Sequence, residues 1–113
     1  MIGPATVLVW EPDGLWEARL ARELEPAFRV RAARGAGDLS RLSPGPSVLI
    51  LTAATAGPWL ELTDRPRCEG TLLVADGAED PLWRSAGVSA VFDETTSAGH
   101  VAAVVRRVLT PPP

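Results

Sequence analysis

The stretch that decides the fold is Val48-Leu-Ile-Leu51, four apolar residues between the turn sequence Ser43-Pro-Gly-Pro46 and Thr52. It is too short for a helix and carries no polar side chain, which predicts a central strand covered on both faces. Such strands are typical of parallel sheets, because the helices that connect parallel strands pack on both faces. We therefore look for strands and helices that alternate on either side of it.

Four other short runs have the composition of strands. Residues 5–10 and 71–75 are almost wholly apolar, 28–32 alternates apolar residues with arginine, and 89–92 is shorter. The alternation predicts a strand with one solvated face and places 28–32 at an edge of the sheet. Together with residues 48–51, these runs predict five strands.

The segment after the first strand predicts an amphipathic helix. Trp16, Leu20 and Leu24 recur every four residues and so lie on one helix face. Asp13 is the expected N-cap, because its side chain can accept a hydrogen bond from a free N–H group of the first turn. Pro26 has no N–H group to donate, so the helix is expected to end before it.

Other helices are expected after the remaining strands. Short helices are predicted over 38–42 and 80–86, and the neighbouring prolines leave room for about two turns around 59–63. The last helix is expected to begin near Ser97. Its apolar stripe, at spacings i, i+3, i+4 and i+7, consists of Val101, Val104, Val105 and Val108.

Five strands that alternate with helices predict an α/β fold with a parallel sheet and right-handed crossovers. We expect a flavodoxin-like, doubly wound, three-layer α/β/α architecture with strand order 2-1-3-4-5 and a shortened third helix. Residues 1–110 are expected to form this single domain, and Pro111-Pro-Pro113 a proline tail.

Composition argues against several functional classes. The formal charge is -3 and the isoelectric point is near 5.1, and the longest basic run is Arg106-Arg107, so direct binding to nucleic acid is not expected. No apolar run reaches the roughly 20 residues of a membrane span, and no secretory signal is evident, so we expect a cytoplasmic protein without membrane contact. Cys68 is alone, which excludes an internal disulfide. The chain contains no lysine.

Ligands of a doubly wound sheet bind beyond the carboxyl ends of the strands. The residues there are mostly acidic. Glu11 and Asp13 follow the first strand, Asp76 follows the fourth, and Asp93-Glu94 follows the fifth, whereas Thr52 ends the third. These residues are the candidates for function.

Three stretches resemble the receiver domains of bacterial response regulators, the CheY-like family of two-component signal transduction. Val7-Leu-Val-Trp-Glu-Pro-Asp-Gly14 is similar to the strand that ends in Mg²⁺-binding acids. Pro46-Ser-Val-Leu-Ile-Leu-Thr52 is similar to the strand that ends in the phosphoacceptor aspartate. Ala86-Gly-Val-Ser-Ala-Val-Phe-Asp-Glu94 is similar to the segment that ends in the invariant lysine. The resemblance covers nearly the whole chain.

The resemblance implies that the family's chemistry is lost. Thr52 stands at the phosphoacceptor position, Ala75 at the switch position and Glu94 at the lysine position. Glu11 and Asp13 remain as candidate Mg²⁺ ligands, but Pro12 replaces a metal-binding acid. Phosphoryl transfer to a carboxylate needs a nucleophilic aspartate, a divalent cation and a further positive charge, so an atypical or pseudo-receiver is expected.

The leading functional prediction is a phosphorylation-independent signalling module, without enzymatic activity, that binds a protein partner or itself. The usual output surface of receivers would here include Arg84, Ser89, Val91 and the helix from Ser97, and a homodimer through that surface is expected. No cofactor is expected apart from the candidate Mg²⁺.

Two alternatives belong to other classes. Glu11, Asp13, Asp76 and Glu94 could form a divalent-cation site of carboxylate oxygens. A hydrolase or transferase would use Ser97 or Thr52 with His100, although no third catalytic group is evident. The first turn lacks the G-x-G-x-x-G spacing of dinucleotide-binding folds.

The tryptophans allow two interpretations. Trp10 and Trp16 are expected in the core, whereas Trp59 fits either the core or an interface equally well.

Overall fold

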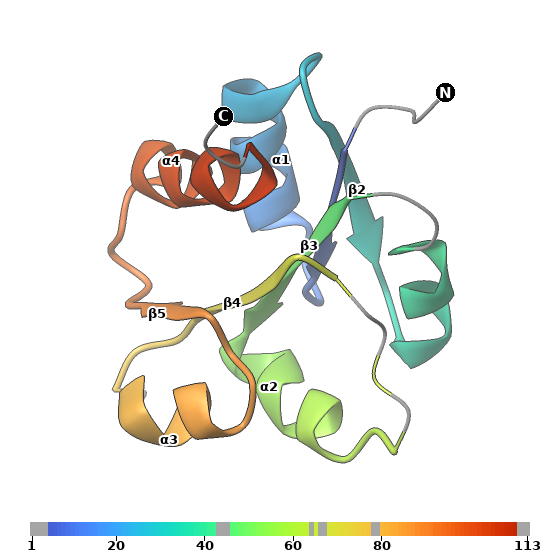
Figure 1. The fold of residues 1–113 in the computed structure, drawn as a ribbon, viewed down its shortest axis with the longest axis vertical. Coiled ribbons are helices and arrows are strands. Elements are labelled where there is room, and N and C mark those ends of the chain that lie inside the picture. The colour runs from blue at the N-terminus through green and yellow to red at the C-terminus, as the bar shows by residue number, and fades with distance from the viewer. Residues whose placement is uncertain (1–4, 43–45, 64, 66–67, 78–79, 111–113) are drawn as a thin grey trace.

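The computed structural model is a five-stranded parallel sheet with helices on both faces (Figure 1). The structure describes residues 5–42, 46–63, 65, 68–77 and 80–110, so the predicted proline tail lies outside the described residues. The strand order is β2-β1-β3-β4-β5, which confirms the predicted fold class. The strands are β1 (Thr6–Trp10), β2 (Arg29–Ala33), β3 (Ser47–Thr52), β4 (Gly70–Val74) and β5 (Ala90–Phe92).

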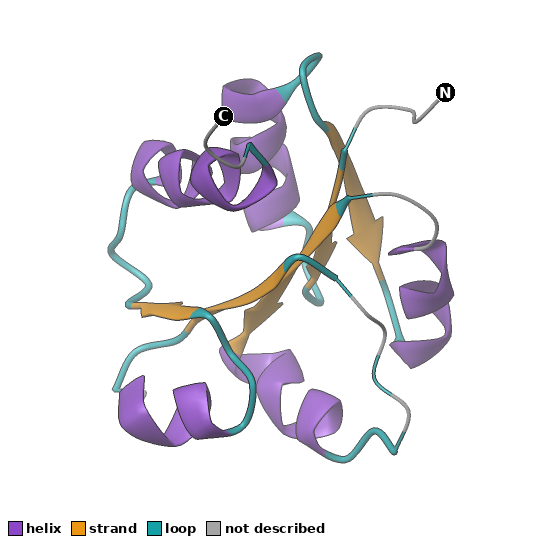
Figure 2. Ribbon diagram, in the orientation of Figure 1, coloured by secondary structure: helices purple, strands orange, loops and turns teal. Residues whose placement is uncertain are grey.

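Helices follow every strand. Figure 2 shows α1 and α4 on one face of the sheet, and α2, α3 and a 3₁₀ helix, η1, on the other. Their bounds are α1 (Leu15–Leu24), η1 (Ala36–Leu42), α2 (Ala53–Leu60), α3 (Asp80–Ser85) and α4 (Ala98–Leu109). None of them, within the described part of the chain, has the length and apolar character needed to cross a bilayer.

Successive residues of the central strands supply two separate cores, because strand side chains alternate between the faces of a sheet. In β3, Val48 and Ile50 pack with α1 and α4, whereas Leu49 and Leu51 pack with α2 and η1. All four side chains are buried. The first core includes the predicted helix faces Trp16, Leu20, Leu24, Val101 and Val105, and the second includes Trp10 and Trp59.

The burial of Trp59, which is 3% exposed, decides between its two interpretations in favour of the core. Trp10 and Trp16 are buried as predicted.

The helix after β3 lies elsewhere than predicted. It has about the expected length, but it begins directly at Ala53 instead of near Trp59. Thr52 and Thr55 form a capping box, in which the Thr52 N–H group donates to Thr55 Oγ1 at 3.0 Å. Pro58 lies inside this helix. Because proline has no N–H group, the carbonyl of Ala54, four residues earlier, receives no helical hydrogen bond. Ala54 is exposed in the first turn of the helix. The predicted position was wrong because Pro58 is tolerated inside the helix and because the capping box starts the helix at Ala53.

Arg65 connects α2 to the end of α3. Its Nη1 donates to the Ala86 carbonyl at 2.9 Å and its Nη2 to the Leu60 carbonyl at 3.1 Å. The guanidinium also lies over the Trp59 ring, 4.2 Å from the centroid. A planar guanidinium can make all three contacts at once, whereas an ammonium group cannot.

We expect Arg65→Lys to lower the free energy of unfolding by about 1 kcal/mol, since the charge remains but the forked pair of hydrogen bonds is lost. Urea denaturation followed by tryptophan fluorescence measures the change. Arg22→Lys, at an exposed position of α1, is the matched control and should change stability little. Equal effects of the two substitutions would contradict this role of Arg65.

Candidate functional site

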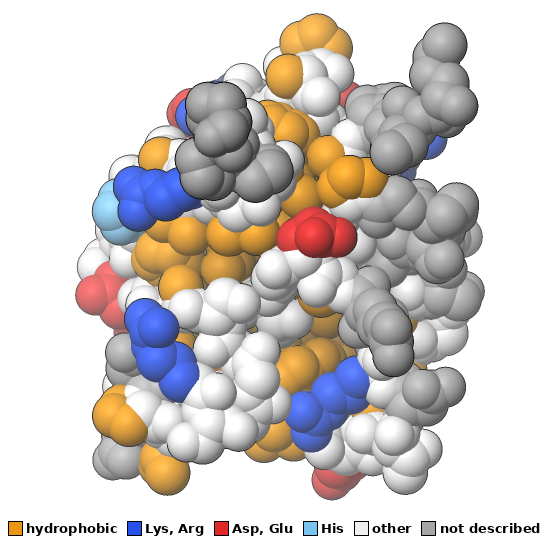
Figure 3. Space-filling model, in the orientation of Figure 1, with side chains coloured by type: hydrophobic (Ala, Val, Ile, Leu, Met, Phe, Trp, Pro, Cys, Tyr) orange, Lys and Arg blue, Asp and Glu red, His pale blue; other side chains and the backbone are white. Residues whose placement is uncertain are grey.

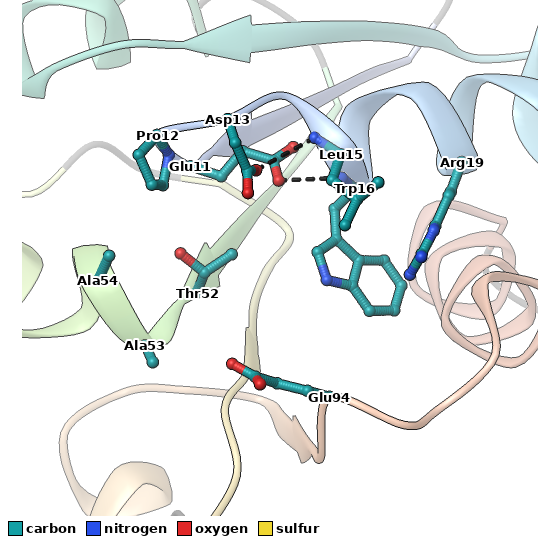
Figure 4. Close-up of a pocket in the computed structure, with 10 residues that line it drawn as sticks. All are labelled: Glu11, Pro12, Asp13, Leu15, Trp16, Arg19, Thr52, Ala53, Ala54 and Glu94. Atoms are coloured by element: carbon teal, nitrogen blue, oxygen red, sulfur yellow. Dashed lines mark hydrogen bonds between the residues drawn. The ribbon is translucent and has the colours of Figure 1, made fainter.

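A hollow of about 440 Å³ lies where β1, β3 and β5 end, at the edge of the sheet where doubly wound folds bind ligands. Figure 4 shows Glu11 and Asp13 on one side of it, Glu94 across from them, and Thr52 between. The structure thus brings four of the predicted site residues together. The lining consists of Glu11, Pro12, Asp13, Leu15, Trp16, Arg19, Thr52, Ala53, Ala54 and Glu94.

Glu11 caps helix α1. Its Oε1 accepts a hydrogen bond from the Trp16 N–H group at 2.9 Å and its Oε2 one from the Glu17 N–H group at 2.7 Å. Both carboxylate oxygens therefore satisfy backbone donors that a helix start leaves free. The residue is only 3% exposed. Burial raises the pKa of the Glu11 carboxyl, while the two backbone hydrogen bonds act in the opposite direction.

The predicted N-cap at Asp13 is wrong. The N-cap residue is Gly14, whose φ of 76° is a left-handed conformation that glycine adopts without strain. Asp13 is exposed and accepts a hydrogen bond from the Leu15 N–H group at 3.2 Å. The capping role of Glu11 was not predicted, because its carboxylate binds N–H groups five and six residues ahead, outside the usual local pattern.

Thr52 ends β3 and starts α2. Its N–H group is bound to Thr55 Oγ1, which itself donates to the Trp10 carbonyl at 2.8 Å. The Thr52 hydroxyl lies 3.5 Å from Thr55 Oγ1. A hydroxyl becomes a useful nucleophile when an adjacent base removes its proton, and Thr55 is not a base.

Glu94 approaches the hollow from the loop after β5. Its N–H group donates to Asp76 Oδ1 at 2.7 Å, so Asp76 positions the loop through its side chain. The neighbouring Ala75 is 8% exposed and donates its N–H group to the Phe92 carbonyl at 2.9 Å. The side chain of Ala75, at the predicted switch position, has no hydroxyl and therefore cannot form a hydrogen bond.

The charges around the hollow are mostly negative. Glu11, Asp13 and Glu94 face one basic side chain, Arg19, whose guanidinium carbon lies 5.5 Å from the centre of the Trp16 ring. No group of three or more His, Cys, Asp or Glu side chains that could hold a metal ion exists among the described residues. Glu11 and Asp13 are both occupied by helix N–H groups, and their role as metal ligands remains a prediction.

Ser97 and His100 lie at the start of α4, outside the lining of this hollow. The Ser97 hydroxyl accepts a hydrogen bond from the His100 N–H group at 3.1 Å and so caps the helix. The His100 ring stands edge-on to Phe92, with 5.7 Å between ring centroids. Thr52 lines the hollow and His100 does not, so the Thr52–His100 pair of the hydrolase alternative is not brought together. Ser97 and His100 are neighbours, but the Ser97 hydroxyl is bound to the backbone N–H group of His100.

Glu11→Ala should lower the free energy of unfolding by about 2 kcal/mol, because it leaves two N–H groups without partners at the start of α1. Asp13→Ala, the matched control, removes one exposed bond and should cost about 0.5 kcal/mol. Thermal unfolding with and without millimolar Mg²⁺ measures both effects. If Mg²⁺ stabilised the wild type but neither variant, the two residues would be metal ligands and the capping account would be insufficient.

Comparisons with known proteins show a likeness of fold. No protein-family model matches the sequence, and no curated protein matches it significantly. The crystal structure of ShkA Rec1, a receiver domain in complex with c-di-GMP, superposes with a TM-score of 0.68 over 90% of this chain and 89% of that one. The two sequences are 22% identical. The chain therefore has the flavodoxin-like fold of response-regulator receiver domains.

Proposed function

We propose that this chain is a receiver-like signalling module that works by binding a protein partner and takes no part in phosphoryl transfer. The observation that carries the proposal is the hollow at the strand ends. It keeps the position of a receiver active site but is lined by Thr52 and Glu94. It thus offers neither a carboxylate nucleophile at the end of β3 nor a cation at the end of β5.

Electrostatics supports the proposal. An incoming phosphoryl group is anionic, and its transfer is favoured by cations near its oxygens. Asp13 and Glu94 instead supply negative charge on two sides of the hollow. The charge of Arg19 is held against the Trp16 ring. A phosphoryl group at Thr52 would therefore meet repulsion.

The hydrogen bonds of Glu11 also support the proposal. A carboxylate that accepts hydrogen bonds on both oxygens holds α1 in place, and a metal ion would have to compete with those N–H donors. Glu11, the acid at the end of β1, therefore stabilises the fold. Under this proposal, signalling depends on the outer surface of the domain.

Incubation with acetyl phosphate and Mg²⁺ is expected to leave the intact mass of the protein unchanged, because no competent acceptor faces the hollow. Intact-mass spectrometry measures the result, and a phosphorylatable receiver domain treated in parallel verifies the reagent. An added, alkali-labile phosphoryl group would refute the proposal and would make Asp76 the first acceptor to test.

A second candidate ligand is c-di-GMP, which the structurally similar ShkA Rec1 binds. Exposed Arg84 on α3 and exposed Arg107 on α4 lie on either side of β5, whose Phe92 is half-buried. Figure 3 shows basic side chains on both sides of an apolar area here. Arginine can pair with the phosphates, and an aromatic ring can stack on a guanine base.

If c-di-GMP binds this area, calorimetric titration should give saturable binding that weakens at least about tenfold in Arg107→Glu, since one phosphate contact becomes a repulsion. Arg29→Glu, on the opposite edge of the sheet, is the matched control and should bind like the wild type. The absence of heat with the wild type, or an equal loss in both variants, would remove this candidate.

A further inference from the structure

Helix α3 is short, so its position depends on the contacts that hold it. It consists of six residues, Asp80–Ser85, whereas isolated helices of fewer than about 12 residues are marginal in water. Trp83 and the following Ala86 pack against the core that also contains Trp59. Leu82 is 65% exposed, and Arg84, a residue of the expected partner surface, is also exposed. A shift of α3 would therefore move the surface that this helix offers to a partner.

Arg65 ties the end of α3 to the end of α2, the helix beside it on the same face of the sheet (Figure 1). Its two hydrogen bonds, at 3.1 Å and 2.9 Å, go to the carbonyls of Leu60, the last residue of α2, and Ala86, the residue after α3. Carbonyls at the end of a helix lack a helical donor, and the helix dipole favours a cation there. One guanidinium thus satisfies both helix ends.

The buried ring of Trp59 supports this bridge. The ring centroid lies 4.2 Å from the guanidinium carbon of Arg65, and Trp59 is only 3% exposed. The chain that leaves α3 passes the same ring, since a Cβ added to Gly87 would be 3.9 Å from Trp59 Cη2. Gly87 has a φ of 108°, which glycine adopts without strain. A fixed aromatic ring therefore lies next to both Arg65 and the end of α3.

The side chains at the end of β4 make no corresponding contact with α3. Ala75 has no hydroxyl, and its N–H group donates to the Phe92 carbonyl of β5. The Asp76 carboxylate accepts from the Glu94 N–H group, in the loop after β5. Among the described residues, these connections from the edge of the hollow lead toward β5, whereas the tie of Arg65 to α3 comes from the side of α2.

We infer that Arg65 is a lock that holds α3 in one position whatever the state of the hollow, so that the partner surface on α3 is always presented. The inference rests on the proposed function and names its regulation, because the surface then needs no event at the hollow to become available. Arg65 is a positioning residue, since it acts on a partner only through α3. Arg65→Lys opens the lock, because an ammonium group cannot hold both carbonyls while it lies flat on the ring.

NMR relaxation dispersion of backbone amides measures whether α3 moves on the microsecond-to-millisecond timescale. In the wild type, residues 82–88 should show no exchange. In Arg65→Lys the population of an open α3 should rise at least about fivefold, so exchange should appear in residues 82–88 and stay absent from β1 and β3. Arg22→Lys is the matched control and should behave like the wild type. A merely structural role of Arg65 would lower stability without exchange confined to α3.

Independence from the hollow is tested with Glu94→Gln, which removes one of the charges that line it. The amide signals of residues around the hollow should shift, whereas those of residues 82–88 should stay in place. An α3 in exchange in the wild type, a rigid α3 in Arg65→Lys, or signals of residues 82–88 that follow the Glu94 substitution would each overturn the inference. None of these outcomes alters the intact mass after acetyl phosphate treatment, so a failure of the lock is distinguishable from a failure of the proposed function.

Discussion

The burial of β3 on both faces is the constraint on which the rest of the structure depends. Its apolar side chains alternate between the core under α1 and α4 and the core under α2 and η1. A shift of one residue would exchange the two sets, so the register of β1 and β4 against β3 is strongly specified. This register brings Thr52, Trp10 and Val74 to one edge of the sheet, and the hollow forms there.

At these strand ends, polar side chains stabilise the fold instead of carrying out the chemistry that their position permits. Glu11 holds the start of α1, Thr55 ties α2 to the end of β1, and Asp76 holds the loop after β5. In each case a polar side chain satisfies a backbone group that a strand end or helix start leaves free. Side chains bound in this way stabilise the junctions between strands and helices. Their substitution should therefore lower the stability of the domain more than it changes the binding of a ligand.

The layered fold could be predicted from the sequence because its signals are local. Apolar runs such as 48–51 and the four-residue spacing of Trp16, Leu20 and Leu24 record the burial of one strand or one helix face. The capping role of Glu11 and the position of α2 depend on contacts between separate elements, and Pro58 lies inside α2 although proline usually ends a helix. The grouping of the site residues was predictable from the strand ends, whereas their hydrogen-bond partners were not.

The positions of the charged residues around β5 are also a product of the topology. Helix α4 packs on the sheet against the direction of β5, so the last turn of α4 lies near the first residue of the strand. Basic residues favour the carboxyl end of a helix, where the helix dipole is negative, and Arg106 and Arg107 occupy that turn. Asp93, which directly follows β5, accepts hydrogen bonds from Thr95 in the loop that leads to α4. The distribution of charge around β5 therefore arises from features that also stabilise the single domain.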